Sequence, residues 1–336
     1  MSGALIIDRA GPAMTIQDLG RPGLLHMGVP RGGAADRLAL CENAALLGQS
    51  PNCAVVEMAG YGGTFRATCD VAVALTGAIM RADIDGQPVK WNAAHQMHSG
   101  QILTIGAATQ GVYGYLGVKG GFQTPVVLGS RAAQLTCQIG GLLQSGDTLE
   151  VVPVSSFNAC KLDISARFGG AEVRYIAGPQ TDLFSPETQK LFQETTFTRD
   201  AAANRQGVKF DSGGAQFATD GQLALLSDAI TVGDIQLTGD GVPYVLMPEC
   251  QTIGGYPRIG TVIPQDMPIV AQSAVGDKVR FRQITLEDAV ASYESELDRT
   301  RSLSARVTPL VRDPAKMTDL LSYQLISGMV TGWEDA

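Results

Sequence analysis

The stretch YVLMPECQTIGGYPRIGTVI, residues 244–263, places a polar, glycine-rich centre between two apolar runs. Gly254 and Gly255 permit a positive φ or a close approach of the backbone to another surface. We therefore predict a turn between two strands, at which backbone N–H groups, an amide, a hydroxyl and the Arg258 guanidinium meet. A tight hairpin that merely carries polar residues is the alternative interpretation.

Composition extends this β pattern to the whole chain. The 336 residues include 40 glycines and 16 prolines, 45% are hydrophobic and 17% are charged. The length suggests roughly two domains, and a turn-rich chain favours many short strands over long helices. Between residues 54 and 153, short apolar runs alternate with turn signals such as Asp85-Gly86, as in a barrel or sandwich.

We expect three regions along the chain. Residues 1–155 form an N-terminal β-barrel-like half, residues 170–284 form a C-terminal half, and a polar connector that ends in glycine joins them. Gly146-Asp147 and Gly276-Asp277 each precede an apolar run, and this short echo favours two similar β units. Residues 285–336 form a helical C-terminal extension.

Helix signals are few. A helix is predicted over residues 34–47, with Asp36 in its first turn, where a carboxylate suits the helix dipole. Ser185-Pro186 predicts a second helix start that runs to about residue 194. Residues 286–300 show an apolar stripe at helical spacing and are expected to dock on the core. Another helix is expected around residues 319–329.

Charge and cysteine content exclude several classes of protein. The net charge is −8, the pI is about 4.9, and no basic cluster is present, so nucleic-acid binding is not expected. The six cysteines form no C-x-x-C pair and read as reduced thiols of a cytoplasmic protein. No apolar run reaches about 18 residues, so no membrane span is expected.

Familiar catalytic motifs are missing from the sequence. The chain has no phosphate-binding P-loop, no dinucleotide-binding glycine motif after a strand, and no G-x-S-x-G nucleophile elbow. It has three histidines, and His95 and His98 lie among predicted strands rather than on one helix face, so no metal site is predicted.

Three polar, glycine-rich loops remain as candidate binding segments. They are residues 15–23 with 30–36, residues 117–131, and residues 248–258. Each places Arg, Asp, Gln or Thr beside glycines, a composition that suits a small polar or anionic ligand held by backbone N–H groups and a guanidinium. None of them contains an obvious nucleophile.

Together these loops resemble the signatures of the biotin-dependent carboxyltransferase family, which includes allophanate hydrolase subunit 2, KipA and the C component of 5-oxoprolinase. The resemblance covers about residues 3–285. It rests on TIQDLGRPG at 15–23 with Asp36, LGVKGGF at 116–122 with LGSR at 128–131, GPQTD at 178–182, and QTIGGYPRI at 251–259.

The resemblance implies a mainly β, cyclophilin-like barrel fold in two related halves and a role in a multi-subunit enzyme. The implied activity is ATP-dependent cleavage of 5-oxo-L-proline to L-glutamate, with a KipI-like companion and a LamB/YcsF-like subunit as partners. ATP acts in the complex at a site not located in this chain, and biotin is a possible second cofactor. The alternatives are a biotin-dependent carboxyltransferase subunit acting on urea or a similar small amide, and a KipA-like regulator that binds a KipI-like kinase inhibitor.

The same resemblance suggests roles for individual residues. Asp36 or Glu249 serves as a catalytic base or as the partner of an arginine. The substrate-binding candidates are Arg21, Gly120, Gly121, Gln180, Arg205, Gln251, Thr252, Gly254, Gly255, Tyr256 and Arg258. Ile253 stands where relatives carry Thr, so we expect the substrate preference to differ there, because a site that hydrogen-bonds a hydroxyl discriminates steeply.

Overall fold

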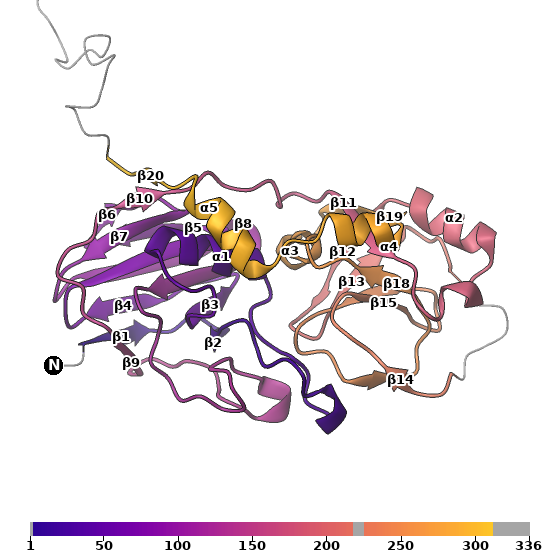
Figure 1. Cartoon of the computed structure of the whole chain (residues 1–336), viewed down its shortest axis with the longest axis horizontal. Coiled ribbons are helices and arrows are strands. Elements are labelled where there is room, and N and C mark those ends of the chain that lie inside the picture. Colours follow the sequence, from indigo (N-terminus) through magenta and orange to yellow (C-terminus); the bar gives the residue numbers. More distant parts are fainter. Residues whose placement is uncertain (1–2, 218–224, 312–336) are drawn as a thin grey trace, which may run out of the picture.

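The computed structural model describes residues 3–217 and 225–311, and it is mainly β. Figure 1 shows two β bodies, one built from the N-terminal part of the chain and one from the C-terminal part. The expected fold class, a mainly β barrel architecture in two related halves with a few helices, is confirmed. In the described part of the chain, no helix has the length and apolarity needed to cross a membrane.

The first half is one large sheet organised on two long strands, β5 (Val71–Ile84) and β8 (Ile102–Val118). They pair antiparallel, and their inner side chains fill a core around Leu75 and Leu116. The path through the sheet is β20-β10-β7-β5-β8-β4-β1-β9, with β3 on β8, β2 on β3 and β6 on β5. The other strands are β1 (Gly3–Arg9), β2 (Met14–Gln17), β3 (Val55–Ala59), β4 (Thr64–Ala67), β6 (Gln87–Pro88), β7 (Ala93–Met97), β9 (Thr148–Val151), β10 (Cys160–Lys161) and β20 (Thr308–Pro309).

The second half is a closed seven-stranded barrel in the order β11-β18-β15-β16-β13-β12-β19. Neighbours are antiparallel except β11 and β19, which are parallel. Phe192 of a covering helix packs against Phe197, Phe217 and Phe281 and fills the barrel core. The strands are β11 (Glu172–Ile176), β12 (Phe197–Ala203), β13 (Gly207–Asp211), β15 (Asp234–Leu237), β16 (Pro243–Leu246), β18 (Arg258–Val262) and β19 (Lys278–Ile284), while β14 (Asp228–Ala229) and β17 (Ile253–Gly254) pair outside the barrel.

The Gly-Asp pair that recurs in the sequence, at 146–147 and 276–277, forms the same turn in both halves. Asp147 and Asp277 each accept a hydrogen bond on Oδ2 from the backbone N–H three residues earlier, at 2.8 Å in both cases. Each aspartate follows a glycine with positive φ and opens a strand, β9 or β19. Each strand then pairs antiparallel, β9 with β1 and β19 with β12. This shared turn agrees with two related halves.

Two of the predicted helices are present, and the first begins three residues later than expected. α1 (Arg37–Leu47) ends at Gly48, and Asp36 is its N-cap rather than a residue of its first turn. α2 (Pro186–Glu194) has Ser185 as its N-cap. Three 3-10 turns, η1 (Leu25–Met27), η2 (Leu135–Cys137) and η3 (Thr181–Leu183), lie in loops.

The prediction of one docked helix over residues 286–300 is wrong. The structure has α4 (Leu286–Ala291) and α5 (Glu296–Ser304), because Ser295 caps a new helix. The apolar stripe faces solvent: Leu286 is 61% and Val290 is 65% exposed. α5 packs on α1 instead, and β20 pairs with β10 of the first half. The helix expected around residues 319–329 lies outside the described residues.

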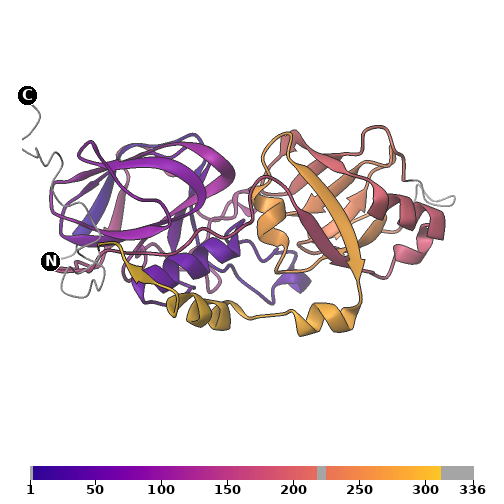
Figure 2. The same ribbon diagram turned by 90° about the horizontal axis from the view of Figure 1, so that it is seen from above.

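The two halves share a packed junction. α3 (Met267–Gln272) follows β18 and lies between the halves, and one hydrophobic cluster joins barrel residues to Ala39, Tyr113 and Tyr115 of the first half. In Figure 2 the halves lie side by side, and α4 and α5 run along one edge from the barrel to the first half. The junction positions the loops described next.

Candidate functional site

The glycine-rich segment 248–257 is not a hairpin loop. β16 and β18 flank it but do not pair with each other, because β15 lies between them in the barrel. The segment crosses the outside of the barrel, where the carbonyl of Thr252 accepts from the N–H of Ile230 and β17 pairs with β14. The segment therefore does connect two strands, as predicted, but the alternative of a tight hairpin is wrong, since β18 pairs with β15 from earlier in the chain.

A cleft of about 590 Å³ opens on this outer wall of the barrel. One side is the hairpin between β12 and β13, the floor is the outward face of β15 and β16, and the other side is residues 250–256. Such a volume is typical of sites for small ligands. The described lining residues are Ala201, Ala202, Ala203, Asn204, Gln206, Gly207, Ile230, Gln236, Thr238, Tyr244, Leu246, Cys250, Gln251 and Tyr256.

Gln236, on β15, is the most buried amide of the cleft. It is 8% exposed, and its Nε2 donates a hydrogen bond to none of the described residues. A Cβ added at Gly254 would lie 2.8 Å from this nitrogen. Neither Gly254 nor Gly255 has a positive φ, so backbone conformation does not require glycine here. Glycine at 254 instead allows the backbone to approach the Gln236 side chain closely.

Two predicted ligand residues, Gln251 and Tyr256, line the cleft directly, and both are exposed. Thr252 does not line it, and its carbonyl holds the loop to Ile230. Ile253, the expected position of altered preference, is 60% exposed and lies outside the described lining.

Arg258 lies behind the cleft with its guanidinium fully engaged. Its Nη2 contacts Asp228 at 2.5 Å, and its Nη1 contacts Asp234 at 3.1 Å and the carbonyl of Ala229 at 2.6 Å. The Oε1 of Gln180 accepts from the Nε and the backbone N–H of Arg258. Arg258 and Gln180 thus hold β14 against the barrel, and their predicted role toward a substrate stays a prediction.

Arg205 connects the two halves. Its Nη1 pairs with Glu57 of β3, its Nε contacts Glu249 at 2.6 Å, and its Nη2 donates to the carbonyl of Gly33 at 2.7 Å. Burial disfavours the charged guanidinium, but the two carboxylates outweigh burial and raise the pKa of Arg205. Glu249 is therefore an arginine partner in this structure, which is one of the two roles predicted for it.

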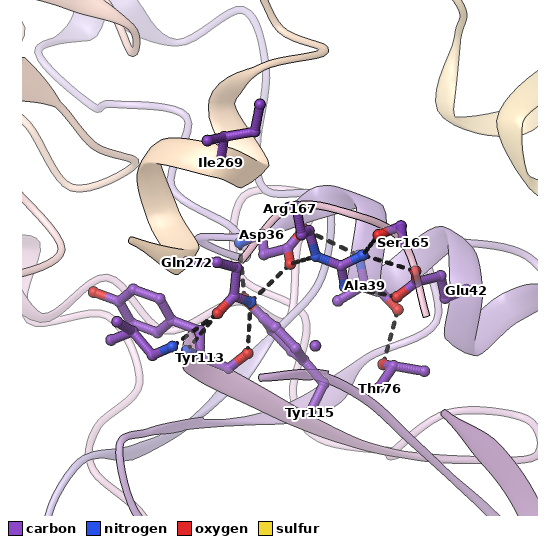
Figure 3. A network of polar contacts seen from close by, with 12 residues as sticks. Asp36, Ala39, Glu42, Thr76, Tyr113, Tyr115, Ser165, Arg167, Ile269 and Gln272 are labelled. Atoms are coloured by element: carbon purple, nitrogen blue, oxygen red, sulfur yellow. Dashed lines mark hydrogen bonds and ion pairs between the residues drawn. The ribbon is translucent and has the colours of Figure 1, made fainter. Parts of the chain in front are cut away.

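Asp36 lies in a second buried network, shown in Figure 3. Its Oδ1 accepts from the N–H of Ala39, and its Oδ2 accepts from Nε2 of Gln272 at 2.8 Å. The Nε of Arg167 lies 2.8 Å from the same oxygen, in an ion pair rather than a directed hydrogen bond. Asp36 is fully buried, so it acts here as a helix cap and arginine partner.

Arg167 completes this network. Its two terminal nitrogens contact the two carboxylate oxygens of Glu42 at 2.7 Å each. Burial opposes the charge of Arg167, and the carboxylates of Asp36 and Glu42 raise its pKa in spite of that. Gln272 joins the network to β8, since its Oε1 accepts from the N–H groups of Val112 and Tyr113.

Arg21 is buried in the first half. Its Nη2 donates to the carbonyl of Ala132 at 2.5 Å, and burial lowers the pKa of its guanidinium. Next to it, the carboxylate of Asp18 accepts from the Ser130 hydroxyl and the Arg131 N–H. The Gly-Ser-Arg turn thus binds an internal carboxylate.

Gly120 and Gly121 form the turn after β8, both with positive φ. An added Cβ would meet Val152 at Gly120 and Cys53 at Gly121. No contact joins these two described glycines to the cleft, whose described lining comes entirely from the barrel half.

The sequence interpretation missed Gln236, Tyr244, Asn204 and Arg167. Gln236 and Tyr244 lie on strands whose alternate residues, Ile235 and Val245, fill the barrel, so strand periodicity was the available signal for the outward face. Arg167 lies in the expected connector, where no pattern predicted a buried ion pair.

Cys250 carries the one thiol among the described lining residues, and it is not a ready nucleophile. Burial raises its pKa to about 12, so it stays a neutral thiol near pH 7. The described lining contains no Ser, His, Lys, Asp or Glu. These residues can bind a ligand, and they include no activated nucleophile.

Residues 27–283 match the family model of the carboxyltransferase domain, subdomain A and B. This region contains the barrel, the cleft and most of the large sheet, and the chain belongs to this family. Among solved structures, urea carboxylase of Kluyveromyces lactis shares the fold, with a TM-score of 0.80 at 21% identity, over 93% of this chain and 31% of that chain. TTHA0988 gives a TM-score of 0.75 at 26% identity, over 84% of this chain and 56% of that chain.

Two relatives match along almost their whole length. The C component of 5-oxoprolinase from Haemophilus influenzae is 34% identical over 86% of this chain and 95% of that protein. The C component of 5-oxoprolinase from Escherichia coli is 32% identical over 87% of this chain and 95% of that protein. This chain is therefore related to one part of a multi-subunit enzyme.

Proposed function

We propose that this chain is a subunit of an ATP-dependent complex that cleaves 5-oxo-L-proline to L-glutamate. The observation that carries the proposal is the near full-length similarity, at 34% and 32% identity, to the C components of two 5-oxoprolinases. We propose a KipI-like chain and a LamB/YcsF-like chain as its partners.

The cleft supports a binding role in that reaction. The lactam ring of 5-oxoproline has one carbonyl acceptor and one N–H donor, and the molecule also carries a carboxylate. The amides of Asn204, Gln236 and Gln251 offer both donors and acceptors, and Tyr244 and Tyr256 offer flat apolar faces. This combination suits a small, polar ring.

The same cleft does not fit the triphosphate of ATP. Polyphosphates are held by cations and by backbone N–H groups at helix N-termini or nests. The described lining has no Lys or Arg and comes from strands and loops. We therefore assign ATP to a site outside this cleft and give this chain the task of holding the lactam.

Reconstitution tests the proposal. This chain is purified with its KipI-like and LamB/YcsF-like partners, and glutamate release from 5-oxoproline is measured with and without ATP. We expect release only when all three chains and ATP are present. Absence of release from the complete, assembled mixture would contradict the proposal.

Carboxyl transfer is a second candidate, favoured by the match of residues 27–283 to a carboxyltransferase domain. The uncharged cleft also fits the ureido ring of biotin, which is a cyclic amide like the lactam. Such an activity needs a biotin carrier from another chain. A thermal shift with biotin but none with 5-oxoproline would favour this candidate, and the reverse would count against it.

A further inference from the structure

We propose that the barrel cleft recognises the uncharged carbonyl–amide part of its ligand through Gln236, and that a carboxylate on the ligand is bound by a cation from another chain. The proposed role of Gln236 rests on the cleft alone. The choice of 5-oxoproline as the carboxylate-bearing ligand rests on the proposed function.

The unpartnered amide nitrogen of Gln236 supports recognition of a ligand carbonyl. A buried amide nitrogen without an acceptor is unfavourable, and such groups in native proteins point to a missing water or ligand. Nε2 of Gln236 is such a donor, and Gln236 lies in the wall of the cleft. Because this nitrogen is itself buried, a ligand carbonyl oxygen satisfies it once the Gln236 amide turns toward the cleft.

Gly254 leaves space for the Gln236 amide. A Cβ at position 254 would come within 2.8 Å of Nε2 and 3.1 Å of the Ile230 side chain. The Gln236 amide would have to shift, because real Cβ contacts are not that short. The backbone of Gly254 lacks a positive φ, so alanine fits the local conformation and the clash with Gln236 is the main consequence.

The distribution of charge around the cleft supports the proposal that another chain binds the ligand carboxylate. No residue of the described lining is charged. The nearby guanidinium groups are already engaged: Arg205 by Glu57 and Glu249, and Arg258 by Asp228 and Asp234. A ligand carboxylate therefore gains no ion pair from the described residues of the cleft.

Ligand binding to the full-length chain tests the inference, measured by calorimetry or by ligand-observed NMR. The probes are 2-pyrrolidinone, which is the lactam alone, 2-imidazolidone, which is the ureido ring alone, 5-oxoproline, and L-proline, which has a carboxylate but no lactam carbonyl. We expect 2-pyrrolidinone and 5-oxoproline to bind within about threefold of each other, because an added ion pair would give about tenfold or more. L-Proline is expected not to bind.

Two variants locate the donor. Gln236→Leu removes it at similar volume, and Gly254→Ala displaces it. Each is expected to weaken 2-pyrrolidinone binding about five- to tenfold, the value of one hydrogen bond. Gln144→Leu makes the same chemical change on an exposed side chain of the first half and is expected to leave binding unchanged. Circular dichroism and melting temperature confirm that each variant is folded.

Three results would overturn the inference: no binding of either ring, unchanged binding by folded Gln236→Leu, or a tenfold preference of the isolated chain for 5-oxoproline over 2-pyrrolidinone. Preference for 2-imidazolidone over the lactam keeps the role of Gln236 and assigns the ureido ring as the ligand. The proposed function fails separately, when the assembled complex releases no glutamate. If the complex releases glutamate but the folded Gln236→Leu variant binds 2-pyrrolidinone as tightly as the parent, the inference fails and the proposed function stands.

Discussion

The junction between the halves and the cleft on the barrel use polar side chains in opposite ways. At the junction, Arg167 is buried and Arg205 is partly buried, and each is paired with two carboxylates. In the cleft the described lining is uncharged, and the Nε2 of Gln236 has no partner among the described residues. Buried charges need partners, so these two arginines are committed to holding structure together. The uncommitted amide is the group left for a ligand.

Among these predictions, replacement of Arg167 should cause the largest loss in the free energy of unfolding. Arg167→Met leaves Asp36 and Glu42 buried without their cation, and breaking a buried pair in this way costs about 3–5 kcal/mol. Urea denaturation of the full-length chain measures it. Arg66→Met removes a solvent-exposed pair with Asp8 and should destabilise the fold far less. Equal losses in the two variants would erase the distinction between junction and surface.

Gln272 should come second. Gln272→Leu removes the acceptor of two backbone N–H groups on β8 and one donor to Asp36, and a cost of about 2 kcal/mol follows from such unsatisfied groups. Gln144→Leu is the matched control and should stay within about 0.5 kcal/mol of the parent. Hydrogen exchange should also speed up at Val112 and Tyr113, and unchanged exchange there would argue against the junction role.

In the same denaturation assay, replacement of Gln236 should leave the free energy of unfolding almost unchanged. Gln236→Leu replaces an amide whose nitrogen has no described partner, so stability should change by less than about 0.5 kcal/mol or rise slightly. A loss as large as that of Gln272→Leu would show that the amide is structural. The cleft would then lose its contrast with the junction.

Cysteine reactivity should give the smallest effect. Burial raises the pKa of Cys250 to about 12, so at pH 8 it stays a thiol and reacts slowly with iodoacetamide, while the exposed Cys137 is modified first. Mass spectrometry of peptides from native and urea-unfolded protein checks the order. Because the folded pKa is raised, the Cys250 thiol stabilises the fold fully below about pH 8.5 and progressively less as the pH rises toward 12. Early modification of native Cys250 would contradict its burial.

Local signals in the sequence predicted local structure well. Ser185-Pro186 opens α2, Gly48 ends α1, and Asp85-Gly86 forms the two-residue turn between β5 and β6, both residues with positive φ. These succeed because each depends on a few neighbouring residues. The single helix over 286–300 was wrong because the cap at Ser295 competes with the apolar stripe.

The site was predicted only in part. The glycine-rich segment does border the cleft, and Gln251, Gly254 and Tyr256 lie at or beside it. Arg205 and Glu249 lie at the junction, and Asp36 lies deeper within it. Residue type alone could not separate these roles, since an arginine that binds a ligand and one that binds a buried carboxylate look alike in sequence.

The amino-acid sequence alone determines the many short strands, the caps, the turns and the family signature, because hydrophobic periodicity, capping and φ preferences act over a few residues. Tertiary structure alone decides which of the polar residues are free. β15 lies between β16 and β18, so Gln236 meets Gly254 on the outside of the barrel. The halves meet so that Arg167 and Arg205 each face two carboxylates. Both arrangements depend on pairing between distant segments, which gives Arg167 and Arg205 their carboxylates and leaves the Gln236 amide of the cleft without a partner.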